Sequence, residues 1–128
     1  MSKEEKVCVK VLMNMINYAA KEIAKFNDDY KDKLKGLNEL IAWKVGDDIS
    51  FYTEIKDGDI NGSEGTAPTN PTLTFEISDA EVALKTLTGR QDINEMGDKI
   101  KILGDIGKAE QLNFILDTVK EYLGDLTK

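Results

Sequence analysis

The spacing of apolar residues changes near residue 40, and this change constrains the fold more than any other feature of the sequence. From Lys3 to Phe26 apolar residues recur every three to four positions, a pattern typical of a long amphipathic helix. From Ile41 onward they alternate with polar residues, which is typical of half-buried strands. Helical spacing returns after residue 78. This order excludes an all-α or all-β domain and predicts an α+β fold.

The first helix is expected over about residues 3–26, with Ser2 and Glu5 forming a capping box at its start. A short second helix should follow a break at Asn27 and end near Gly36. We expect the core-facing stripe of these helices to consist of Cys8, Val11, Leu12, Met15, Ile16, Ala19, Ile23, Phe26 and Tyr30. On this interpretation Cys8 is a buried, inert thiol, and Met13 and Met15 also face the core.

Strands are predicted over about residues 41–45, 49–55, 60–66, 72–77 and 99–102. Asp57-Gly58 predicts a tight hairpin between the second and third strands. A helix capped by Asp79 should run to about Leu87 and stop at Gly89, and the last helix should span about 107–123 behind a cap at Asp105. The 128 residues are expected to form one domain, with sheet and helices over about 40–123.

Composition argues against catalysis. The chain has no His, which removes the most common general base near neutral pH. A single Cys and no Cys/His cluster give no expected disulfide, metal or other cofactor. We therefore expect a protein that is not an enzyme. The competing interpretation is a carboxylate enzyme, for instance with Glu54 and Glu76 on adjacent strands.

The distribution of charge limits the partners. Residues 1–40 carry eight Lys and seven Asp/Glu, whereas residues 41–128 carry nine Lys/Arg and seventeen Asp/Glu, so the net charges are +1 and −8. An acidic body disfavours nucleic acid and stable docking on anionic membranes. Lys31, Lys33 and Lys35 form a small basic cluster that would allow transient membrane contact, or simply a solvated helix end. With no long apolar run and no export signal, a cytoplasmic location is expected.

Residues 57–62 resemble the first half of a calcium-binding EF-hand loop. The twelfth position of such a loop requires a bidentate Glu, but here it is Pro68, and the flanking segments have strand spacing. A hairpin is therefore the expected structure, and no metal site is predicted there.

Three sequence blocks, residues 73–79, 84–90 and 99–109, occur in an order and spacing that resembles the sterol-carrier-protein-2 (SCP-2) family. The likeness is clearest over about residues 40–123. It implies an SCP-2-like fold, a mainly antiparallel curved sheet of about five strands covered by helices on one face. The chain departs from the family at residues 91–98, a slightly shorter segment with no Pro or aromatic residue. This departure bears on the shape of the cavity and leaves the ligand class open.

The resemblance implies a non-catalytic carrier that holds a lipid, fatty acid or fatty acyl-CoA in an apolar cavity between the sheet and the C-terminal helices. Burying a chain of about fifteen carbons offers on the order of 12 kcal/mol before the cost of ordering the ligand. Candidate lining residues are Trp43, Phe51, Phe75, Leu84, Leu87, Met96, Ile102, Leu112, Ile115, Leu116 and Val119.

Two other interpretations of these apolar positions stay open. The same side chains could fill a closed core. The protein would then be a regulatory or interaction domain of the same fold with a collapsed cavity, whose long N-terminal helix packs against a partner or forms a homodimer with a second copy.

Overall fold

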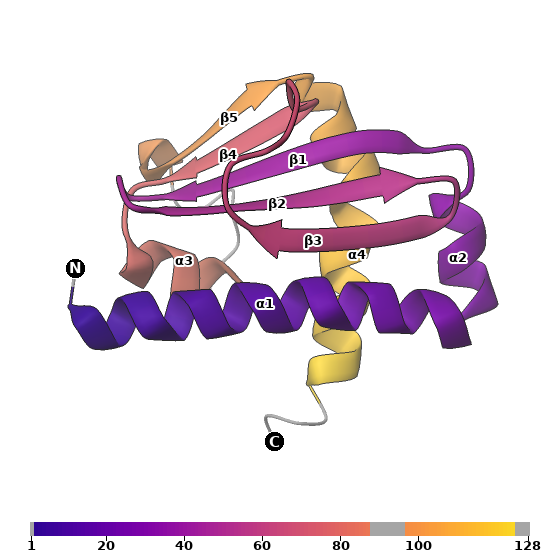
Figure 1. Ribbon diagram of the computed structural model, residues 1–128, viewed down its shortest axis with the longest axis horizontal. Coiled ribbons are helices and arrows are strands. Elements are labelled where there is room, and N and C mark those ends of the chain that lie inside the picture. Colours follow the sequence, from indigo (N-terminus) through magenta and orange to yellow (C-terminus); the bar gives the residue numbers. More distant parts are fainter. Residues whose placement is uncertain (1, 88–96, 125–128) are drawn as a thin grey trace.

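The computed structural model describes residues 2–87 and 97–124, which form one sheet with helices packed on it (Figure 1). The elements in chain order are α1 (Lys3–Phe26), α2 (Asp28–Leu34), β1 (Asn38–Val45), β2 (Ile49–Lys56), β3 (Asp59–Glu64), β4 (Leu73–Ile77), α3 (Ala80–Leu87), a 3-10 turn (Gly97–Lys99), β5 (Ile100–Gly104) and α4 (Ile106–Leu123). The predicted α+β class is confirmed, and element boundaries lie within about three residues of those expected from sequence.

The sheet has five strands in the order β3-β2-β1-β4-β5. Three neighbouring pairs are antiparallel, but β1 and β4 are parallel, which the sequence did not predict. Residues 65–72 provide the crossover, passing in front of β2 and β1 on the face away from α4 (Figure 1). At its ends, Gly65 N–H donates to the Ser50 carbonyl over 2.8 Å and Thr72 N–H donates to the Leu40 carbonyl over 2.8 Å.

The core lies between the sheet and helices α1, α3 and α4, as expected from the alternation of apolar residues along the predicted strands, which is clearest in β2 and β4 (Figure 1). In β2 and β4 every second side chain is buried, and these side chains face the helices. The buried strand residues of this layer are Ile41, Trp43, Val45, Ile49, Phe51, Ile55, Ile60, Leu73, Phe75, Ile77 and Ile100. The sheet therefore presents one continuous apolar face, and α1 and α4 pack on it.

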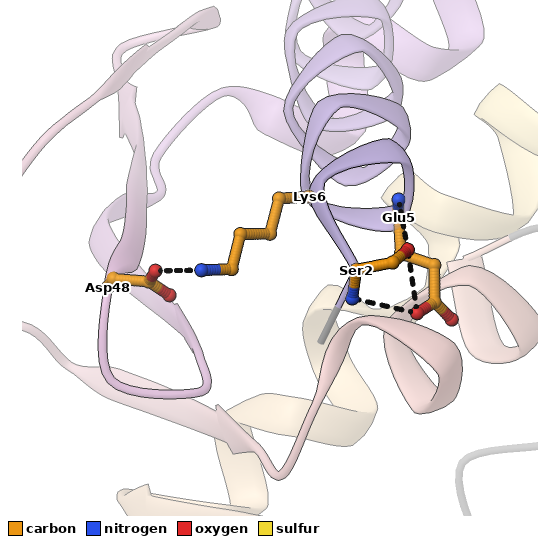
Figure 2. A network of polar contacts seen from close by, with 4 residues as sticks. All are labelled: Ser2, Glu5, Lys6 and Asp48. Atoms are coloured by element: carbon orange, nitrogen blue, oxygen red, sulfur yellow. Dashed lines mark hydrogen bonds and ion pairs between the residues drawn. The ribbon is translucent and has the colours of Figure 1, made fainter.

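The N-terminus of α1 is capped as predicted (Figure 2). Glu5 N–H donates to Ser2 Oγ over 3.1 Å, and Ser2 N–H donates to Glu5 Oε1 over 3.2 Å. One residue further, Lys6 Nζ lies 2.7 Å from Asp48 Oδ2 in the β1–β2 turn. The start of α1 is thus both capped and tied to the end of the sheet.

The core-facing stripe predicted for α1 is only partly correct: Ile16 and Ile23 are buried as expected, and Leu12 and Ala19 pack against the core. Its buried residues are Val9, Met13, Ile16, Asn17, Ala20, Ile23 and Ala24. Val11, Met15 and Phe26 are 60%, 36% and 84% exposed, and Cys8 is exposed rather than a buried thiol. The helix is apolar around most of its circumference, so spacing alone left two faces in competition. The sheet selects the face with Ala20 and Ala24, whose small side chains permit close packing.

The structure confirms some of the predicted turns and helix caps and not others. The 57–58 hairpin is confirmed, with φ of 49° at Asp57 and 87° at Gly58, as a type I′ turn requires. Asp79 caps α3 through a 3.0 Å bond from Val82 N–H. Asp105 takes the N-cap position of α4, but its side chain accepts no capping hydrogen bond. The predicted stop at Gly89 lies outside the described residues.

Candidate functional site

A cavity of about 290 Å³ lies between α1, α4 and the helix-facing side of the sheet. This is near the lower end of the range of roughly 300–1,000 Å³ that is common for small-molecule sites. Its lining is Met13, Ile16, Asn17, Ala20, Ile41, Trp43, Thr53, Leu73, Phe75, Leu87, Ile102, Ile106, Ala109, Glu110, Leu112, Asn113, Ile115 and Leu116. The wall is therefore mainly aliphatic and aromatic, which suits an apolar ligand.

The floor of the cavity contains two stacked aromatic side chains from adjacent parallel strands. Trp43 on β1 and Phe75 on β4 are register partners, and their rings lie 4.5 Å apart at an angle of 13°. Both are 7% exposed. Two rings locked against each other give this wall a fixed shape.

The cavity opens beside the first half of α4. Ile106 is 62% exposed, and Glu110 and Asn113 are also exposed. At the opposite side Met13, Asn17 and Thr53 are buried. A ligand would thus enter past α4 and reach toward α1 and β2.

A chain of hydrogen bonds crosses the buried side of the cavity. Trp43 Nε1–H donates to Thr53 Oγ1 over 3.3 Å, and the Thr53 hydroxyl donates to Asn17 Oδ1 over 2.8 Å. Asn17 Nδ2 is buried and has no partner among residues 2–87 and 97–124. The amide lies against Gly62 on β3, where any Cβ would collide with it. A Gly in this strand therefore makes the room in which Asn17 fits.

The structure places the predicted lining residues in three groups. Trp43, Phe75, Leu87, Ile102, Leu112, Ile115 and Leu116 line the cavity. Phe51 and Val119 are buried in the core without lining it, and Leu84 is partly buried and packs against the same core. Met96 lies outside the described residues. Contact of any of these side chains with a ligand stays a prediction.

The prediction missed the contribution of α1 and the polar pair. Asn17 and Ala20 were missed because the stripe predicted for α1 did not include them, and Met13 was expected in the core but not in a cavity lining. Thr53 could have been found from the sequence, because it is the polar residue in the otherwise apolar buried row of β2 formed by Ile49, Phe51 and Ile55. A polar residue in an apolar row must find a partner, and Asn17 is that partner.

The proposed carboxylate pair does not form. Glu54 and Glu76 were expected on adjacent strands, but β1 lies between β2 and β4, and neither residue lines the cavity. Within the described ranges, no group of three or more His, Cys, Asp or Glu side chains is placed to hold a metal. No helix in that part of the chain combines the length and the apolar character that crossing a membrane requires.

Comparison with known families gives a match over most of the chain. The sequence profile of the SCP-2 sterol transfer family matches residues 20–117. No curated protein sequence matches.

Solved structures give matches of the same kind. Sterol carrier protein 2 from Yarrowia lipolytica, in its apo form, aligns with a TM-score of 0.64 and 16% identity, covering 84% of this chain and 88% of that one. Palmitated SCP2L2 from Aedes aegypti aligns with a TM-score of 0.58 and 14% identity, covering 80% and 91%. The sec-alkylsulfatase Pisa1 from Pseudomonas sp. aligns over 68% of this chain but only 14% of its own, with a TM-score of 0.52 and 15% identity. At these identities the alignments establish a shared fold.

Proposed function

The chain belongs to the SCP-2 sterol transfer family, and we propose that it is a non-catalytic carrier that holds a lipid, fatty acid or fatty acyl-CoA. The observation that carries the proposal is the apolar cavity between α1, α4 and the sheet, open beside α4. Its lining offers a hydrocarbon chain the same surroundings as a protein core. The palmitated state of the Aedes aegypti structure supports an aliphatic ligand for this fold.

The energetics favour a hydrocarbon chain as the part that is bound. Each buried methylene contributes roughly 0.8 kcal/mol, so a chain of ten or more carbons can offset the loss of ligand freedom without a strong polar anchor. Polar groups of the ligand would then decide selectivity more than affinity.

The single Trp of the chain gives a direct test, because Trp43 lies on the cavity floor. Titration with palmitate should change the emission of Trp43 and saturate at one ligand per chain. Ala20→Phe fills the cavity from α1, and we expect it to weaken binding at least tenfold. Val11→Phe is the matched control, because Val11 is on the exposed side of the same helix.

The result that overturns the proposal is a Trp43 emission that stays constant up to saturating palmitate. Equal binding by the wild type and by both Phe variants would also overturn it, since the ligand would then lie elsewhere. Thermal melts of all three proteins establish that the Phe variants are folded before they are compared.

A second candidate function is self-association through α1. Val7, Val11 and Tyr18 are 59%, 60% and 67% exposed, and their spacing places them on one side of the helix. On this hypothesis the protein is an interaction domain of the same fold that pairs with a second copy. Light scattering of lipid-free protein would then give a dimer mass, and Val11→Glu would return it to a monomer.

We also propose where the carrier acts. We place the carrier in the cytoplasm, where it would contact membranes only transiently. The basic cluster at α2 is a weak candidate for that contact, because Lys35 pairs with Asp32 at 3.1 Å and Lys33 Nζ lies 5.6 Å from the Phe114 ring centre. Vesicle sedimentation of Lys31→Ala measures the contribution of the remaining lysine.

A further inference from the structure

The cavity contains a polar atom that the fold itself does not use. Asn17 is 7% exposed, its Oδ1 is occupied by the Thr53 hydroxyl, and its Nδ2 has no acceptor within the described part of the chain. A buried N–H group without a partner is costly, so it is rarely retained unless something pairs with it. Asn17 lines the cavity, so a ligand bound there is placed to supply the acceptor.

Two features hold the Asn17 amide in place. The Thr53 hydroxyl accepts a hydrogen bond from the Trp43 indole N–H and donates one to the amide oxygen of Asn17. Gly62 on β3 leaves the space that the amide occupies. An apolar side chain of this size would fill the same space, so packing of α1 on the sheet does not by itself require an amide at position 17. Packing alone does not require the hydrogen bonds from Trp43 to Thr53 and from Thr53 to Asn17 that orient this amide.

The charge of the lining narrows the ligand further. Among the described residues that line the cavity there is no Lys or Arg, and the single ionisable side chain is Glu110 beside the opening. A carboxylate carried to Asn17 would be buried without a cation, which is strongly unfavourable. An uncharged oxygen can accept from the amide without that cost.

We propose that Asn17 is the polar anchor of the cavity, and that it selects an aliphatic chain ending in an uncharged oxygen, such as an alcohol, inserted with that oxygen toward α1. This proposal rests on the proposed lipid-carrier function and names the ligand class of the same site. A chain with a charged head group would bind in the opposite direction, with its head in water beside α4.

The test compares 1-dodecanol with dodecane, each delivered from cyclodextrin and followed by Trp43 emission. The two ligands share the chain and differ in one oxygen. Asn17→Leu, of nearly the same size, should weaken dodecanol binding roughly tenfold, the loss expected for one hydrogen bond with its donor removed. Dodecane binding should change less than twofold. Dividing the change in dodecanol affinity by the change in dodecane affinity removes any effect of the substitution on the cavity as a whole.

Two further variants separate the anchor from a purely structural role. Gly62→Ala keeps the amide but displaces it, so it should also lower dodecanol affinity while sparing dodecane. It replaces Asn17→Leu as the decisive variant if the latter does not fold. Asn14→Leu, at an exposed position of the same helix that does not line the cavity, should leave both affinities unchanged.

The outcomes distinguish this inference from the proposed function. If neither ligand binds the wild-type protein, the carrier function fails and the anchor fails with it. If both bind and Asn17→Leu affects them equally or not at all, the carrier stands and the anchor is overturned. Dodecanoate that binds at neutral pH as tightly as dodecanol, with equal sensitivity to Asn17→Leu, would overturn the preference for an uncharged oxygen.

Discussion

Helices α1 and α4 both line one cavity, yet they are anchored to the rest of the molecule very differently. Helix α1 has a complete capping box and buries seven of its side chains. Lys6 pairs with Asp48 in the β1–β2 turn, and Lys10 pairs with Glu64 on β3. Helix α4 lacks a side-chain cap and buries only Leu112, Ile115 and Val119.

The contacts of α4 with its surroundings are correspondingly few. Its ties to other elements include the Lys108–Glu39 ion pair at 3.2 Å, a 3.0 Å hydrogen bond from Asn27 to Tyr122, and the edge-on packing of Tyr30 on Phe114. The wall formed by α1 is therefore firmly fixed to the sheet, whereas the wall formed by α4 is held by a few contacts. We expect entry of a ligand to move α4 and leave α1 in place.

The largest effect expected from this difference concerns two matched core residues. Ile23 of α1 and Ile115 of α4 are 5% and 7% exposed, but only Ile115 lines the cavity. Ile23→Ala should lower the free energy of unfolding by about 2–5 kcal/mol. Ile115→Ala should cost clearly less, because part of its surface already faces empty space. Equal losses in urea denaturation would contradict the contrast between the two walls.

A smaller effect is expected at the two helix starts. Ser2→Ala removes a side-chain cap and should cost about 1 kcal/mol. Asp105→Ala removes no capping hydrogen bond, so we expect only a few tenths of a kcal/mol from the lost interaction with the helix dipole. Thermal melts of both variants measure the difference, and a larger loss for Asp105→Ala would break the comparison.

An effect of similar size but opposite sign is expected at Tyr30, where α2 meets α4. Its hydroxyl is buried and unpaired within the described ranges, and burial raises the pKa of Tyr30 well above its usual value of 10. Tyr30→Phe should therefore increase stability by about 1 kcal/mol at neutral pH.

The pH dependence of stability gives an independent check on Tyr30. Because the folded state holds the phenolic proton more tightly, stability should fall as pH rises above the pKa of about 10 of an unfolded tyrosine. The Phe variant should lose the part of this fall that Tyr30 causes. Unfolding curves between pH 8 and 11 measure it, and identical alkaline slopes for both proteins would contradict the burial of an unpaired phenol.

The smallest effect is expected at the exposed Lys6–Asp48 pair. The hydrogen bond from Lys6 holds the pKa of Asp48 below its usual value of 3.8. The pair therefore contributes at neutral pH and is lost as pH falls through the lowered pKa of Asp48. In Lys6→Met, the pKa of Asp48 followed by NMR should rise toward its usual value, although Lys10 and a backbone hydrogen bond still lower it. The change in melting temperature should be smaller than for Ser2→Ala. An unchanged titration would show that Lys6 is not its cause.

The sequence predicted the elements well because their signals are local. The capping box at Ser2, the turn at Asp57-Gly58 and the cap at Asp79 each depend on residues within a few positions of one another. The parallel pairing of β1 and β4 depends on a long crossover, and no short-range pattern specifies it.

The site was predicted less completely than the fold, for a physical reason. Alternation and periodicity predicted that residues such as Phe75 and Ile115 face inward, and the family resemblance implied that they line a cavity. Asn17 could not be found this way, because helix α1 is apolar on two sides and only its packing on the sheet decides which one is buried. The room for Asn17 comes from Gly62, a residue 45 positions away, and no local sequence pattern links the two.

The central claim, that the space between the two unequal walls takes up a lipid, is tested most directly by the native mass of the intact protein. After incubation with palmitate and removal of the excess, the wild-type chain should gain the mass of one palmitate, and Ala20→Phe should gain none. An unchanged mass for the wild type, or the same added mass on both proteins, would contradict the account.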